Sequence, residues 1–201
     1  MRTATSEQLA RAAADLRRLA RSTAAAMERA SVALAEADAA LADEIVADSV
    51  RLDREREELA RKAPGLRAPA VTVLATIHAL TELERMSLLA LAVARAVQRC
   101  YPHPVLPHEL TPDFVEMGRI AVWLAELTAG TGEVRSLISI EDDLDDLRRI
   151  VADVRNRCDG TAVADVVLLS RHYERFADHA VLLGRLMKSA VPRSQATGTA
   201  A

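Results

Sequence analysis

The chain has 201 residues and a formal net charge of −3, and Phe, Trp and Tyr together make up only 2% of it. Without a basic excess or aromatic side chains for base stacking, it is not expected to bind nucleic acid. Half of the residues are hydrophobic, with only seven Gly and seven Pro, yet no apolar run suits a signal peptide or a membrane span. These features predict an all-α protein of the cytoplasm.

The first part of the chain predicts three helices. Residues 5–63 contain neither Pro nor Gly, and apolar or small side chains recur there every three or four positions, as on the buried face of a helix. One helix of that length is improbable, so we place a break near Asp38, which can cap a second helix. Pro64-Gly65 ends the second helix, and a third is expected over about 70–100.

The second part predicts three more helices. Residues 101–111 contain a run of prolines and are expected to form a linker. Thr111 is followed by Pro and Asp, which is typical of a helix start with the hydroxyl as cap. Helices are therefore expected over about 112–129, 133–158 and 162–190.

The two parts resemble each other. The segment 83–97 (LERMSLLALAVARAV) aligns without a gap on 173–187 (YERFADHAVLLGRLM), at an offset of 90 residues. Chance similarity between Ala-rich helices is the alternative, and we favour internal duplication of a three-helix unit. The expected architecture is two tandem three-helix bundles. The predicted boundaries are 1–100 for the first bundle, 101–111 for the linker, 112–190 for the second bundle and 191–201 for a disordered tail.

Two acidic pairs flank the apolar stripes of the last two expected helices. Glu141 and Asp145 are four residues apart, as are Glu174 and Asp178, so each pair lies on one side of its helix. If the two flanks converge, four carboxylates meet and repel one another unless a cation neutralises them or some take up protons. An all-oxygen ligand set favours Mg²⁺, Mn²⁺, Ca²⁺ or iron.

Each acidic pair also has an interpretation without a metal. The stretch EDDLDDL, which holds Glu141 and Asp145, can be a solvated acidic face. Glu174 can form an ion pair with Arg171 or Arg175. The handedness of the helix packing decides whether the flanks meet.

These motifs resemble those of the PhoU family of phosphate-transport accessory proteins. The resemblance lies in ERFADHA with its counterpart ERMSLLA, in EDDLDDL, and in the bridge YPHPVLPHEL, which is similar to that of actinobacterial members; it covers about residues 9–187. It implies two similar three-helix bundles, each able to hold a multinuclear iron or zinc cluster. Carried over to this chain, the metal ligands of the second bundle would be Glu141, Asp145, Glu174 and Asp178, with Mg²⁺ or Mn²⁺ as further candidates.

The first half departs from the family pattern. Glu84 is followed four residues later by Leu88 where the motif has Asp, and Asp48 is followed by Leu52. We therefore expect Glu84 to be structural and paired with Arg85. At most one metal cluster is expected, in the second bundle.

The resemblance implies a regulator and not an enzyme. Members of the family act between the ATPase subunit of a phosphate ABC transporter and a membrane sensor histidine kinase, and they repress the phosphate-starvation response when phosphate is plentiful. The protein would then be cytoplasmic and reach the inner membrane face only through its partners, with a homodimer left open. The alternatives are a metal-free helical scaffold and a carboxylate-bridged metalloenzyme. The metalloenzyme is disfavoured because no Glu-x-x-His pair, phosphate-binding loop or His-Glu-x-x-His motif occurs.

Overall fold

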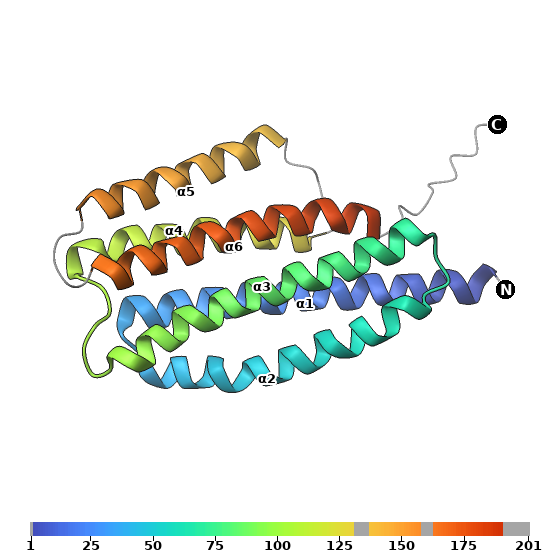
Figure 1. Ribbon diagram of the computed structural model, residues 1–201, viewed down its shortest axis with the longest axis horizontal. Coiled ribbons are helices and arrows are strands. Elements are labelled where there is room, and N and C mark those ends of the chain that lie inside the picture. Colours follow the sequence, from blue (N-terminus) through green and yellow to red (C-terminus); the bar gives the residue numbers. More distant parts are fainter. Residues whose placement is uncertain (1, 131–136, 158–162, 191–201) are drawn as a thin grey trace.

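The computed structural model describes residues 2–130, 137–157 and 163–190, and the regular structure in these ranges is helical (Figure 1). The expected all-α fold is confirmed. The helices are α1 (Arg2–Glu36), α2 (Ala39–Lys62), α3 (Ala70–Cys100), α4 (Thr111–Ala129), α5 (Leu137–Arg157) and α6 (Val163–Ala190), with short 3-10 turns η1 (Ala63–Gly65) and η2 (His108–Leu110). The expected tail at 191–201, and the expected helix ends at 133–136, 158 and 162, lie outside the described residues. Over the described ranges, every helix is too short or too polar to pass through a lipid bilayer.

Four helices, α1, α3, α4 and α6, form the centre of the molecule, and α2 and α5 lie outside them (Figure 1). α3 packs against α6 and α1 against α4, in addition to the contacts within each half. α2 packs on α1 and α3, whereas α5 packs on α4 and α6 at the opposite side of the molecule. Each half is therefore a three-helix bundle, as expected, and the bundles lie side by side. The assignment of 1–100 and 112–190 as domains stays a prediction.

The chain turns from α1 into α2 at Ala37 and Asp38. Ala37 has a φ of 53°, a left-handed conformation that L-residues rarely adopt. The N–H of Asp38 donates to the carbonyl of Ala33 (2.9 Å), which closes the end of α1 as in a Schellman motif. The Asp38 side chain accepts from the N–H of Leu41 (2.9 Å) and caps α2. The predicted cap at Asp38 is confirmed.

The start of α4 differs from the expectation. Leu110 precedes the helix, and no side chain caps its first turn, so the prediction of Thr111 as cap is wrong. The reason is that η2 runs directly into α4 and gives Thr111 helical geometry, with φ −54° and ψ −44°. The stretch 101–111 also contributes to the core, because Val105, Leu106 and Leu110 are buried.

The repeat in the sequence corresponds to matching buried positions in α3 and α6. The buried pairs at the offset of 90 residues are Leu83 and Tyr173, Met86 and Phe176, Ala90 and Ala180, Val93 and Leu183, and Val97 and Met187. α3 and α6 run along each other in the centre of the molecule (Figure 1). Each half thus places the same face of its third helix in the core.

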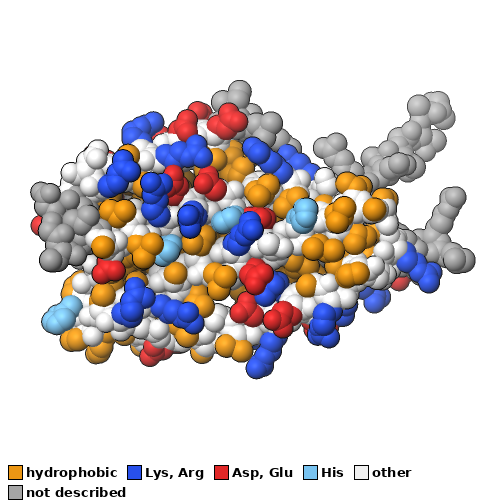
Figure 2. Space-filling model, in the orientation of Figure 1, with side chains coloured by type: hydrophobic (Ala, Val, Ile, Leu, Met, Phe, Trp, Pro, Cys, Tyr) orange, Lys and Arg blue, Asp and Glu red, His pale blue; other side chains and the backbone are white. Residues whose placement is uncertain are grey.

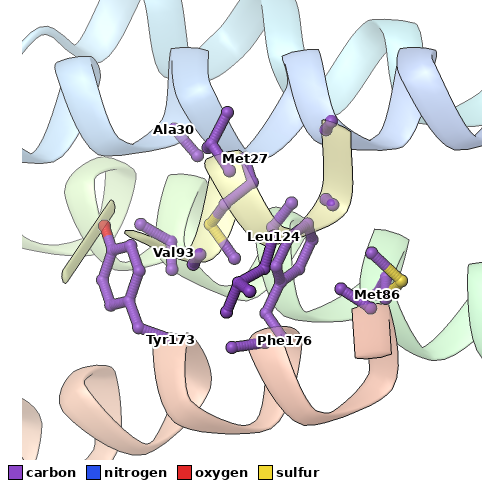
Figure 3. Packing of buried hydrophobic residues seen from close by; sticks show 14 of the residues in the cluster. Met27, Ala30, Met86, Val93, Leu124, Tyr173 and Phe176 are labelled. Atoms are coloured by element: carbon purple, nitrogen blue, oxygen red, sulfur yellow. The ribbon is translucent and has the colours of Figure 1, made fainter. Parts of the chain in front are cut away.

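The core is formed by apolar side chains from all four central helices. Figure 3 shows Met27 and Ala30 of α1, Met86 and Val93 of α3, Leu124 of α4, and Tyr173 and Phe176 of α6 packed together. Small side chains such as alanine allow the helices to approach one another closely. Because these side chains come from both halves, the halves share one core.

α1 and α4 come into close contact at Ser31 and Gly118. A Cβ atom on Gly118 would lie 2.7 Å from Ser31 Oγ and 3.6 Å from a ring carbon of Tyr173. The Ser31 hydroxyl donates to the carbonyl of Met27 (2.8 Å). Tyr173 is fully buried and stacks edge-on against Phe114, with 5.9 Å between ring centroids. Its hydroxyl lies beside Ser31 but has no hydrogen bond of normal geometry among the described residues, and burial raises its pKa while Ser31 lowers it in part.

Candidate functional site

The predicted site lies where α5 packs on α6, and an arginine stands between two of its four carboxylates. Arg148 of α5 donates to Asp145 on its own helix (3.3 Å) and to Asp178 on α6 (3.1 Å). The two acidic flanks therefore converge at Asp145 and Asp178. Both are at the surface, with side chains 69% and 48% exposed.

The other two predicted ligands have different surroundings. Glu174 accepts a hydrogen bond from Arg171, three residues earlier on α6 (2.7 Å), and its side chain is only 18% exposed. The ion pair considered for Glu174 is thus made by Arg171 and not by Arg175. Glu141 is exposed and forms no ion pair or hydrogen bond among the described residues.

As the side chains lie here, the four predicted ligands are not gathered around one point. No three His, Cys, Asp or Glu side chains within the described ranges are grouped so that they could hold one. A cation shared by Asp145 and Asp178 would have to displace the guanidinium of Arg148, which already supplies a positive charge there. On the face seen in Figure 2, acidic and basic side chains lie next to one another over α5 and α6. The four metal ligands stay a prediction.

The first half has a corresponding arrangement on α2 and α3. Arg56 of α2 donates to Glu84 on α3 (3.3 Å) and lies 3.8 Å from Asp53 on its own helix. As in the second half, the arginine follows an acid by three residues and reaches an acid on the third helix of its bundle. The expected pair of Glu84 with Arg85 is wrong. Consecutive residues of a helix point in different directions, and Arg85 binds Glu82 on the same helix instead (2.9 Å).

A pair of buried Glu82 with partly buried His179 joins the two halves, and it was not among the predicted site residues. Glu82 of α3 is 5% exposed, and its Oε2 lies 2.5 Å from Nδ1 of His179 on α6. Its other oxygen accepts from Arg85. A buried carboxylate needs such partners, because its removal from water is costly. A signal was present in the sequence: Glu82 follows Ala79 by three residues and precedes Met86 by four, within the apolar stripe of its helix.

The α3–α6 surface near His172 carries positive charge. Burial lowers the pKa of His172, and the charges of Arg175 and Arg99 lower this pKa further. Arg99 and Arg175 are exposed and have no ion-pair partner among the described residues. The positive charge of these arginines opposes cation binding by the nearby imidazole.

The chain is similar to known proteins along most of its length. No protein-family model matches it. It is 37% identical to the phosphate-specific transport system accessory protein PhoU homolog 2 of Mycobacterium tuberculosis over an alignment of 202 residues. This alignment covers 92% of this chain and 95% of that protein. PhoU homolog 1 of Mycobacterium leprae is 36% identical over 202 residues, with 92% of this chain and 91% of that protein covered.

Two solved structures have a similar fold. The phosphate transport system regulatory protein PhoU from Streptococcus pneumoniae matches with a TM-score of 0.74 over 91% of this chain and 94% of that chain, at 15% identity. PhoU from Pseudomonas aeruginosa matches with a TM-score of 0.53 over 93% and 97% of the two chains, at 18% identity. The identity to relatives over nearly their full length shows that this chain belongs to the PhoU family of phosphate-specific transport accessory proteins.

Proposed function

We propose that the protein is a non-enzymatic regulator of phosphate homeostasis. It would couple a phosphate ABC transporter, through the ATPase subunit, to a sensor histidine kinase and repress the phosphate-starvation response. The observation that carries the proposal is the similarity, along nearly the whole chain, to relatives named as accessory proteins of phosphate-specific transport. The protein would act in the cytoplasm and reach the inner membrane face through its partners.

The shared core supports a role in which one partner influences another. A regulator of this kind needs surfaces that are mechanically coupled, which requires packed elements running between them. Here α3 and α6 pack along each other, and the pair of Glu82 with His179 joins them. A partner bound to α1, α3, α4 or α6 would therefore contact a helix that packs against the other half.

Side chains of the chain itself hold α5 on the second half, and a metal cluster at the predicted carboxylates stays a separate proposal. α5 is held on the second half by apolar side chains, among them Leu147 and Val154, which are fully buried. Arg148 adds a charged contact from α5 to Asp178 on α6. These contacts attach the helix that carries the acidic motif to the rest of the second half.

Deletion of the gene in its host tests the regulatory role. A promoter reporter for phosphate-uptake genes should rise in phosphate-rich medium after deletion and return to its original level with a plasmid copy. Mycobacterium tuberculosis has proteins named PhoU homolog 1 and homolog 2, so the deletion is also made in a strain without any second homologue. An unchanged reporter in a strain without any homologue would contradict the proposal.

A further inference from the structure

A groove lies between α1 and α4, away from the predicted carboxylate site. Its volume is about 500 Å³, and the apolar side chains that line it are Val32, Ala35, Val115, Val122 and Trp123. Val32 and Val115 are 42% and 51% exposed, so apolar surface faces the solvent along this α1–α4 groove. A concave apolar strip between two helices suits the apolar side of a third helix.

α1 and α4 approach each other closely at the α1–α4 groove. Ser31 and Gly118 both line it, and a Cβ atom on Gly118 would lie 2.9 Å from the Cβ of Ser31. The α4 backbone at Gly118 therefore lies directly against the Ser31 side chain of α1. A binding surface that is already formed loses less conformational entropy when a partner docks.

The α1–α4 groove carries uncompensated negative charge. Glu28, Glu36 and Glu126 line it and are exposed, and their carboxylates form no ion pair or hydrogen bond among the described residues. Arg119 also lines the groove, but Glu116 on the same helix accepts two hydrogen bonds from it (2.8 and 2.6 Å). Three unpaired carboxylates beside an apolar strip attract Lys and Arg side chains and repel phosphate groups and anionic lipids.

We propose that the α1–α4 groove binds a short, basic amphipathic helix of a partner protein. Two apolar side chains of that helix, four residues apart, would lie on Val32 and Val115. Flanking Lys or Arg side chains would pair with Glu28, Glu36 and Glu126. The proposal deepens the proposed function, on which it rests for the partner being a protein of the phosphate-uptake system.

The experiment uses the full chain and a synthetic helical peptide of about 16 residues, long enough to hold some helix alone. The peptide has two Leu four residues apart with Lys on both sides, and it contains no Trp. Trp123 is the single tryptophan of the chain and lines the groove, so its fluorescence reports occupancy. Titration should give a saturable change in emission, and anisotropy of labelled peptide should give the same affinity.

Charge variants then locate the binding surface. The triple variant Glu28→Gln, Glu36→Gln and Glu126→Gln should weaken binding by about tenfold or more at low salt, because close opposite charges at an interface are removed. The control triple is Glu57→Gln, Glu109→Gln and Asp142→Asn. Those acids are also exposed and unpaired among the described residues, so this change removes the same charge elsewhere and should leave affinity within about twofold. Far-UV circular dichroism confirms that both variants are folded.

Several results would overturn the proposal. The peptide could fail to bind saturably, or a peptide with Ser at both Leu positions could bind equally well. Equal weakening by both triple variants would mean attraction to net charge alone. A dimer in sedimentation that Val115→Arg converts to monomers would mean that a second copy of the chain occupies the groove. If the peptide does not bind but the deletion strain is derepressed, only the proposal for the groove is rejected. If the peptide binds but the deletion strain is not derepressed, the proposed regulatory role is rejected.

Discussion

Among single residues, Tyr173 combines full burial with a hydroxyl that has no ordinary hydrogen bond within the described part of the chain. A buried polar group without a partner keeps its desolvation cost, so its removal stabilises the folded state. Tyr173→Phe should raise the free energy of unfolding by about 1 kcal/mol, measured by urea denaturation.

The matched control for this prediction is Tyr101, the other tyrosine of the chain, which is 65% exposed. Tyr101→Phe should change the free energy of unfolding by less than about 0.5 kcal/mol. A loss of stability in Tyr173→Phe alone would mean that the hydroxyl is hydrogen-bonded in solution, with Ser31 as the neighbouring partner.

For single residues, the sequence predicted which side of a helix a side chain lies on better than which residue it contacts. Helical spacing placed Asp145 and Asp178 on flanks of their helices, and the structure brings them to one place. That Arg148 stands between them depends on the distance between α5 and α6, which periodicity within one helix does not specify. The Glu82–His179 pair was missed for the same reason, since its members are far apart in the sequence.

At the scale of helices, the end of α1 shows a conflict between residue type and conformation. Ala37 occupies the left-handed position of a Schellman motif, where glycine has no steric cost. The left-handed conformation costs an L-residue about 1–2 kcal/mol, whereas the greater freedom of glycine in the unfolded chain costs about 0.4–1 kcal/mol. Ala37→Gly should therefore stabilise the protein by about 0.5–1 kcal/mol, measured by urea or thermal unfolding.

The same substitution inside α1 provides the control. Ala25 is exposed in the helix interior, and Ala25→Gly should destabilise the protein by about 1 kcal/mol. Opposite signs for the two substitutions are the expected result. Destabilisation by both would show that Ala37 does not hold a positive φ in solution.

The contact between α5 and α6 yields a prediction about metal binding. Arg148→Met removes the guanidinium between Asp145 and Asp178, and the two carboxylates should then bind Mn²⁺ or Zn²⁺ more tightly than the unaltered protein does. Metal content after equilibrium dialysis measures this. Arg149→Met is the matched control, because Arg149 pairs only with Asp146 on its own helix (2.8 Å) among the described residues.

The opposite result has an equally clear meaning. Stoichiometric metal in the unaltered, untagged protein that is lost in Asp145→Ala and Glu174→Ala would show that a cation displaces Arg148. The predicted ligand set would then hold. Equal metal content in all variants would mean that these carboxylates are not ligands.

The local sequence was enough to predict that each helix forms, but it predicted the ends of the helices only in part. The bounds of α3 agree with the prediction because Pro69 and the prolines after Cys100 interrupt a long apolar repeat. The start of α4 was misplaced because the preceding turn η2 already has near-helical geometry. A hydroxyl before a proline marks a helix start only if the chain enters the helix from an extended conformation.

At the scale of the whole molecule, the shared core makes the halves dependent on each other. Side chains such as Met86 of α3, Leu124 of α4 and Phe176 of α6 pack in one cluster (Figure 3). A fragment of residues 1–110 would expose the faces of α1 and α3 that pack on α4 and α6, at about 1.5–3 kcal/mol for each large side chain. The fragment should unfold without a cooperative transition and bind a hydrophobic dye, measured by circular dichroism and fluorescence.

Mixing the fragment with residues 101–190 provides the complementary measurement. If the halves need each other, the mixture should recover a cooperative transition near that of the full chain. A fragment that melts cooperatively alone, with the stability of the full chain, would instead support 1–100 and 112–190 as independent domains.

The overall architecture was predictable because an internal repeat and one proline-rich stretch divide the sequence into two similar parts. How the parts associate was not, since an apolar stripe on a helix does not specify which other helix it packs against. The pairing of α3 with α6 brings together segments about a hundred residues apart, such as Glu82 and His179.

The position of the α1–α4 groove has a dynamic consequence. One wall is a helix of the first half and the other a helix of the second, and they already touch at Ser31 and Gly118. A molecule seated there would hinder swivelling of the halves about that point of contact. Docking would then slow amide hydrogen exchange in α3 and α6. The signal would be a loss of conformational freedom, with the average structure unchanged.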